Sequence, residues 1–141
     1  RPDVRSPRSR PRETMARLRA ALALPPEGYR TGDRLKELSF GAWEGLTWPE
    51  VEAHSPAIAA SRLADKWHTK PPEGENYEDV ATRLGAFVST LERPSVIVSH
   101  GGVGRTLMAL RGTMDRARAS EVFVRQGVVY VFEGDRFTVE A

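Results

Sequence analysis

Apolar residues recur every three or four positions in several stretches of this chain, which is the spacing of an amphipathic helix. Residues 12–24 form the first such stretch, and the prolines of "PPEG" end it. Thr47 can cap a second helix, with Glu50 completing a capping box. Asn76 can cap a third helix. The apolar stripe of that third helix comprises Val80, Leu84, Phe87, Val88 and Leu91.

A different pattern follows in the C-terminal third of the chain. The short apolar run "VIV" at 96–98 predicts a strand that is covered on both faces. Residues 102–110 predict a helix directly behind it, and residues 127–141 predict a β-hairpin that turns at Gly134 and Asp135. Helices that alternate with short apolar strands indicate an α/β sandwich.

Length and composition narrow the class of protein. A chain of 141 residues corresponds to one domain, residues 1–141, and no apolar run approaches the ~20 residues of a membrane span. The absence of cysteine excludes disulfides, thiolate zinc sites and a cysteine nucleophile. No histidines and carboxylates have metal-ligand spacing, so we expect neither a metal nor another cofactor. The net charge of +2 does not by itself indicate a nucleic-acid partner.

His100 is the first candidate for chemistry. It follows the apolar run 96–98 and precedes Gly101 and Gly102, which open the predicted helix. In α/β proteins, ligands bind at this end of a strand, and a helix N-terminus with glycines lets backbone N–H groups approach an anion. From these residues alone, a structural histidine and a catalytic imidazole both remain open.

Three segments, in this order along the chain, bear on the role of His100: "SPRSRPRET" at 6–14, "LKELSFGAWEG" at 35–45 and "VIVSHGG" at 96–102. Together they resemble the motifs of the histidine phosphatase superfamily, the phosphoglycerate-mutase-like fold, and "FGAWEG" is more similar to its phosphatases than to its mutases. "PPEGENYEDVATR" resembles the Gly-Glu-Ser segment of that family, with Asn76 in place of serine. The resemblance implies a three-layer sandwich with a mostly parallel sheet flanked by helices.

The resemblance also implies roles for individual residues. Arg10 would bind phosphate, and a helix capped by Ser9 would place Arg10 in its first turn. His100 and Gly101 would bind the phosphoryl group and stabilise its charge in the transition state. Glu37 would be the general acid, with Glu44 as the alternative acid.

Residues 48–75 are expected to form a substrate lid. Trp48, Trp67 and His68 are the candidates in it to line a substrate pocket. His54 is expected at the surface of a helix.

One family motif is missing, because the sequence contains no Arg-His-Gly, whose histidine is the family's nucleophile. We therefore expect the chain to be incomplete at its N-terminus, with the first strand and the nucleophilic histidine upstream. The expected function is a cytoplasmic phosphomonoesterase that hydrolyses a small phosphorylated metabolite through a phosphohistidine. A homodimer is left open, and this fragment alone is expected to be inactive.

The sequence leaves two other functions open and disfavours two more. An inactive domain that binds a phosphorylated ligand and a phosphoglycerate-mutase-type phosphotransferase remain as alternatives on the same fold. A nucleic-acid-binding arm is disfavoured, because no aromatic residue accompanies the arginines of the first 27 residues. A serine hydrolase using Ser99 is disfavoured, because the sequence has no Gly-x-Ser-x-Gly.

Overall fold

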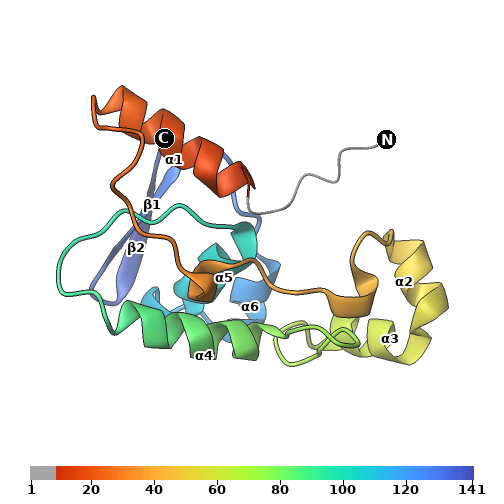
Figure 1. The fold of residues 1–141 in the computed structure, drawn as a ribbon. Helices are drawn as coiled ribbons and strands as arrows, with labels where there is room; N and C mark the ends of the chain where they lie inside the picture. Colours follow the sequence, from red (N-terminus) through yellow and green to blue (C-terminus); the bar gives the residue numbers. More distant parts are fainter. Residues whose placement is uncertain (1–8) are drawn as a thin grey trace, which may run out of the picture.

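A computed structural model of the chain describes residues 9–141 (Figure 1). Six α-helices, two short 3-10 turns and one β-hairpin make up these residues. In chain order they are α1 (Ser9–Ala21), η1 (Asp33–Leu35), η2 (Gly41–Trp43), α2 (Trp48–His54), α3 (Pro56–Ala64), α4 (Tyr77–Val88), α5 (Gly101–Arg111), α6 (Arg116–Glu121), β1 (Val129–Glu133) and β2 (Arg136–Glu140). No helix in this part of the chain is long and apolar enough to cross a bilayer.

The main core lies between α4 and α5, the helices that the sequence predicts at 76–91 and 102–110. The predicted cap of α4 is confirmed, because the Asn76 side chain accepts from the N–H of Asp79 at 2.8 Å and the Asp79 carboxylate accepts from the N–H of Asn76 at 3.0 Å. The buried residues of this core are Leu38, Trp67, Tyr77, Val80, Ala81, Leu84, Val103, Met108 and Ala119.

The predicted hairpin is also confirmed. β1 and β2 pair antiparallel in the register Val131 to Thr138, and Gly134 adopts φ +60° in the turn. Gly112, which ends α5, allows β2 to approach closely, since a Cβ there would lie 2.6 Å from Cδ1 of Phe137.

The fold is α/β and rich in helix, but the predicted three-layer arrangement around a mostly parallel sheet is not seen in residues 9–141. The only sheet among these residues is the two-stranded hairpin. The sequence predicts a buried strand at residues 96–98, and this prediction is wrong. They pair with no strand among the described residues, and Val96 is 72% exposed. A strand needs a neighbour to satisfy its backbone N–H and C=O groups, so this apolar run remains a connection into α5.

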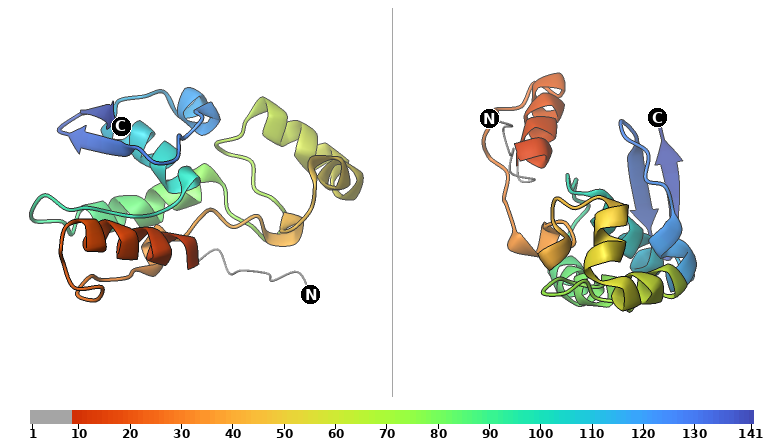
Figure 2. Two further views of the ribbon diagram at one scale, coloured as in Figure 1. Left: turned by 90° about the horizontal axis from the view of Figure 1, so that it is seen from above. Right: turned by 90° about the vertical axis from the view of Figure 1, so that its right-hand side faces the viewer.

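Helices α2 and α3 form a separate lobe at the side of the molecule (Figures 1 and 2). The predicted capping box at Thr47 and Glu50 is present, and α3 follows α2 after the single residue Ser55. The lobe has a small core of its own, made of Trp43, Val51 and Ala59. The predicted lid, residues 48–75, therefore contains two helices and the loop that leads to α4.

Helix α1 stands off from the rest of the molecule and has no buried residue (Figure 2). It begins at Ser9 and ends at Ala21, three residues before each predicted boundary. Pro11 is tolerated because it lies in the first turn, where backbone N–H groups have no partner within the helix. The N-terminal part of the arginine-rich segment, residues 1–8, lies outside the described residues.

Candidate active site

The structure brings Glu37 to the N-terminus of α5. One carboxylate oxygen of Glu37 accepts from the N–H of Gly102 at 3.3 Å, and the other accepts from the N–H of Leu38 at 2.9 Å. The hydroxyl of Ser99 donates to the carbonyl oxygen of Leu35 at 2.8 Å and ties the same two segments together. Residues more than sixty positions apart in sequence thus meet where a helix dipole favours negative charge.

Gly102 is required for this approach. A Cβ at position 102 would overlap Oε1 of Glu37. The second glycine of "SHGG" therefore leaves room for a carboxylate against the first turn of α5.

His100 is the N-cap residue of α5 and is half-buried. Its carbonyl oxygen accepts from the N–H of Gly104 at 3.0 Å, but its ring caps no N–H of the helix. Gly101 follows as the first residue of α5, so His100, Gly101 and Glu37 gather around one helix end. Backbone N–H groups and an imidazole at such an end can bind a phosphoryl group.

Arg10 lies in the first turn of α1, as a helix starting near Ser9 predicts. Its side chain is exposed and makes no hydrogen bond or ion pair with residues 9–141. The structure thus does not join Arg10 to Glu37 or His100 through any contact among these residues.

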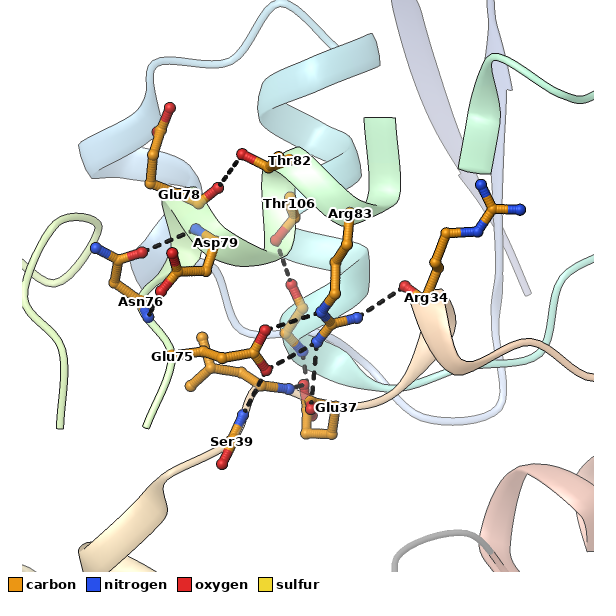
Figure 3. Close-up of polar contacts among 12 residues, drawn as sticks. Arg34, Glu37, Ser39, Glu75, Asn76, Glu78, Asp79, Thr82, Arg83 and Thr106 are labelled. Carbon is orange, nitrogen blue, oxygen red and sulfur yellow. Dashed lines mark hydrogen bonds and ion pairs between the residues drawn. The ribbon is translucent and has the colours of Figure 1, made fainter. Parts of the chain in front are cut away.

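Glu75 and Arg83 hold the Glu37 segment in place (Figure 3). The guanidinium of Arg83 donates to both carboxylate oxygens of Glu75, at 2.9 and 3.2 Å. It also donates to the carbonyl oxygens of Arg34, at 2.7 Å, and Glu37, at 3.4 Å. Oε1 of Glu75 in turn accepts from the N–H of Ser39 at 3.1 Å. One ion pair therefore fixes the backbone on both sides of Glu37.

Two backbone segments pack directly against each other beside this ion pair. The N–H of Ala42 donates to Pro72 O and the N–H of Glu75 donates to Ser39 O, each at 2.8 Å. Glycines make the contact possible, since a Cβ on Gly74 would lie 2.6 Å from Ser39 O and one on Gly41 would overlap Pro72 O. Gly41 of "FGAWEG" and Gly74 of "PPEGEN" therefore allow the backbones of these two segments to pack against each other.

The alternative acid, Glu44, is the residue that directly follows η2. Its carboxylate accepts from the N–H of Phe40 at 2.9 Å. It also lines a pocket of about 770 Å³ between the η2 turn and the α2–α3 lobe. Trp48 lines the same pocket and packs edge-on against Trp43, with 6.3 Å between the ring centroids.

Trp67 and His68 lie elsewhere. Trp67 is 1% exposed and stacks on Tyr77 in the main core, with 5.6 Å between the ring centroids. His68 is exposed, and its ring contacts the carboxylate of Asp65 at 3.0 Å. The N–H and ring of His68 hold the pKa of Asp65 below its usual value. Neither Trp67 nor His68 lines the pocket beside Trp48.

Sequence reasoning missed Glu75 and Arg83 as residues that organise the site. The signal was available, because both belong to the segment "PPEGENYEDVATR" that resembles the Gly-Glu-Ser motif. The spacing of eight residues between Glu75 and Arg83 gave no indication that both side chains would bind the backbone of residues 34–39.

The family model described as histidine phosphatase superfamily (branch 1) matches residues 1–141. The chain belongs to this family. Its relatives include 6-phosphofructo-2-kinase/fructose-2,6-bisphosphatases: that of Caenorhabditis elegans is 42% identical over 77 residues, and isoenzyme 1 of Bos taurus is 36% identical over 91 residues. These alignments include 53% and 63% of this chain but only 17% and 19% of those relatives.

Solved structures of the same family have a similar fold. A native mycobacterial glucosyl-3-phosphoglycerate phosphatase is 26% identical with a TM-score of 0.71, and the match covers 92% of this chain and 70% of that one. The same mycobacterial enzyme in complex with inorganic phosphate is 25% identical with a TM-score of 0.66, covering 94% and 71%.

Proposed function

We propose that this chain belongs to a phosphomonoesterase that hydrolyses a small phosphorylated metabolite. The observation that supports the proposal most directly is the meeting of Glu37, His100 and Gly101 at the N-terminus of α5. Membership of a phosphatase family points to the same chemistry.

In this proposal the phosphoryl group binds at the N-terminus of α5. Its oxygens accept from the N–H of Gly101 and from the His100 imidazole, while Glu37 stays on the N–H of Gly102. His100 stabilises the charge that develops on phosphorus, and Arg10 contributes a phosphate contact if α1 closes over the site. Glu37 gives a proton to the leaving oxygen as the P–O bond breaks.

The covalent step requires a second imidazole. Its nitrogen would attack phosphorus to form a phosphohistidine, which water then hydrolyses to inorganic phosphate and free histidine. No Arg-His-Gly occurs in residues 1–141, so the nucleophile of this mechanism would have to come from outside them.

The names of two relatives support a proposal for the class of substrate. One is named for fructose-2,6-bisphosphate and another for glucosyl-3-phosphoglycerate, which are both small phosphorylated metabolites. We propose a substrate of the same general kind for this chain.

The test uses protein expressed from the complete gene. His100→Ala should lower the turnover of p-nitrophenyl phosphate by about 100-fold or more, as the loss of a charge-stabilising donor implies. His54→Ala is the matched control and should retain wild-type turnover, because His54 is exposed on α2 and its ring contacts the Ser55 hydroxyl at 2.6 Å, not the residues around the N-terminus of α5. Equal turnover in the His100→Ala protein would remove this histidine from the site. Phosphate binding without turnover in the wild type would favour the alternative, an inactive domain that binds a phosphorylated ligand.

A further inference from the structure

Strand β2 is an open edge of the hairpin. It pairs with β1 on one side, and no further strand or backbone hydrogen bond from the described part of the chain reaches its other side. All of its residues except Phe137 are exposed, and the hairpin lies at the margin of the molecule, on the side away from α1 (Figure 2). An edge strand presents unpaired N–H and C=O groups, which can pair with another strand.

Val139 is an apolar residue of this edge that the fold leaves uncovered. It lies opposite Tyr130 in the hairpin, and it shares a face of β2 with Phe137, because side chains two positions apart in a strand point to the same side. Tyr130 and Phe137 pack against the main core, whereas Val139 is 44% exposed. A strand added beside β2 would continue this apolar face and cover Val139.

The two ends of β2 carry opposite charges, Arg136 and Glu140. Glu140 lies opposite Val129 in the hairpin, so β1 offers it no cation. Arg136 lies opposite Glu133, but neither Arg136 nor Glu140 forms an ion pair with any residue that the structure describes. Charges on an edge strand oppose indiscriminate pairing, so the strand that pairs with β2 must carry matching charges.

A second copy of β2 carries the matching charges. The sequence of β2, "RFTVE", has Thr138 at its centre. When two such strands pair antiparallel about Thr138, Arg136 of each copy lies opposite Glu140 of the other. A parallel pairing in the same register would instead place like charges opposite each other, which is unfavourable.

The same antiparallel register also matches the apolar residues. Phe137 of each copy lies opposite Val139 of the other on the face that packs against the core, and aromatic residues opposite β-branched ones stabilise a sheet. The outer edge of β1 has no such symmetry, because pairing two copies of β1 about Val131 would place Val129 opposite Glu133. The charges and the exposed valine therefore both favour β2.

We propose that β2 is the interface of a homodimer, in which the β2 strands of two copies pair antiparallel and join the two hairpins into one four-stranded sheet. The same surface is used by both copies, so a two-fold axis at Thr138 closes the assembly at two chains. A strand of five residues makes a small contact, and the dissociation constant is expected to be on the order of 10 μM. The inference concerns assembly and does not depend on the proposed function.

The test measures the monomer–dimer equilibrium by analytical ultracentrifugation of protein from the complete gene, at concentrations from about 1 to about 200 μM. The wild type should change from monomer to dimer over this range. Arg136→Glu and Glu140→Arg each place like charges opposite each other at both ends of the paired strands, so each should raise the dissociation constant about tenfold or more. Arg118→Glu, which makes the same charge change at an exposed residue of α6, is the matched control and should leave the dissociation constant unchanged.

Mixing the two variants gives a second, sharper measurement. The β2 strand of the Arg136→Glu protein carries two anions, and that of the Glu140→Arg protein carries two cations. An equimolar mixture should therefore form heterodimers with close to the wild-type dissociation constant, although neither variant dimerises well alone. The double variant Arg136→Glu/Glu140→Arg should likewise dimerise as the wild type does, because the charges are exchanged but still match. A loss of dimer caused by local misfolding would not be restored in either way.

Three results would overturn the inference: a wild type that stays monomeric over the whole range, a dimer whose dissociation constant changes in neither single variant, or a mixture of the two variants that does not dimerise. Hydrogen exchange identifies the other occupant of the edge. Slow exchange at Phe137 or Val139 in a monomeric wild type would show that another segment of the complete protein covers β2 in place of a second copy.

Discussion

Glu37 is the residue whose environment says most about the chemistry of this chain. Its carboxylate accepts from the N–H of Gly102 and from that of its neighbour Leu38. A carboxylate that accepts two hydrogen bonds has little freedom to move, so the Glu37 carboxylate is held at one place against α5. Gly102 leaves room for the carboxylate, because a Cβ at this position would overlap Oε1 of Glu37.

We therefore predict that Gly102→Ala displaces Glu37 without changing any charged residue. If Glu37 is the general acid, kcat for an alkyl phosphate should fall about tenfold or more, while kcat for p-nitrophenyl phosphate, whose leaving group needs no proton, should change little. Gly85→Ala is the control, because a Cβ on that residue of α4 would meet nothing within 4 Å. Equal losses for both substrates would assign Glu37 a structural role.

Tyr77 is a second residue with a testable environment. Burial raises the pKa of its hydroxyl above the ordinary value of 10.0, although the nearby guanidinium of Arg105 opposes the shift. Above about pH 10 the unfolded chain loses a proton that the folded chain keeps, so the free energy of unfolding falls as the pH rises.

Tyr77→Phe should therefore flatten the alkaline loss of stability, as measured by urea denaturation at several pH values from about 8 to 11. Lys66, whose pKa is lowered by burial, contributes a slope of the opposite sign, but it is present in both proteins and cancels in the comparison. Identical pH profiles for the two proteins would contradict the prediction.

At the scale of elements, one ion pair joins the start of α4 to the loop that precedes η2. Arg83 is on α4, Glu75 precedes its cap, and both bind the backbone of residues 34–39. Their side chains are 19% and 27% exposed, so the pair is partly shielded from water. The pair acts on Glu37 through the backbone, which makes Glu75 and Arg83 positioning residues.

Arg83→Met should lower the free energy of unfolding by about 2 kcal/mol, because it removes charge-assisted hydrogen bonds and leaves Glu75 unpaired. Arg17→Met is the comparison variant. Arg17 and Glu13 form an exposed ion pair, which should contribute about 0.5 kcal/mol or less to the free energy of unfolding. The double variant Glu75→Gln/Arg83→Met should lose less than the sum of the single variants. Strict additivity would show that the two side chains do not act together.

At the scale of the whole molecule, the described chain has two lobes that bury different numbers of residues. The lobe around α4 and α5 buries nine residues, including Trp67, Leu84 and Met108, whereas the α2–α3 lobe buries only Trp43, Val51 and Ala59. Local opening is easiest where few apolar side chains are buried.

Hydrogen exchange should show this difference. Amides of α2 and α3 should exchange through openings of lower free energy than those of α4 and α5. Uniform protection across both lobes in the free protein would contradict the assignment of a weaker lobe.

The sequence by itself determined the features that depend on neighbouring residues. The caps at Thr47 and Asn76, the boundaries of α5 and the hairpin at Gly134 are encoded within a few positions of each other, so local preferences were sufficient to predict them. The ordered motifs likewise identified the family without any structure.

Only the tertiary structure decided what lies together. It placed Glu37 against Gly102, paired Arg83 with the backbone of Glu37 and buried Trp67 in the core. It also left residues 96–98 unpaired, because a strand exists only where another strand meets its backbone. Contacts between distant positions depend on how whole elements pack, and no local pattern of hydrophobic and polar residues specifies them.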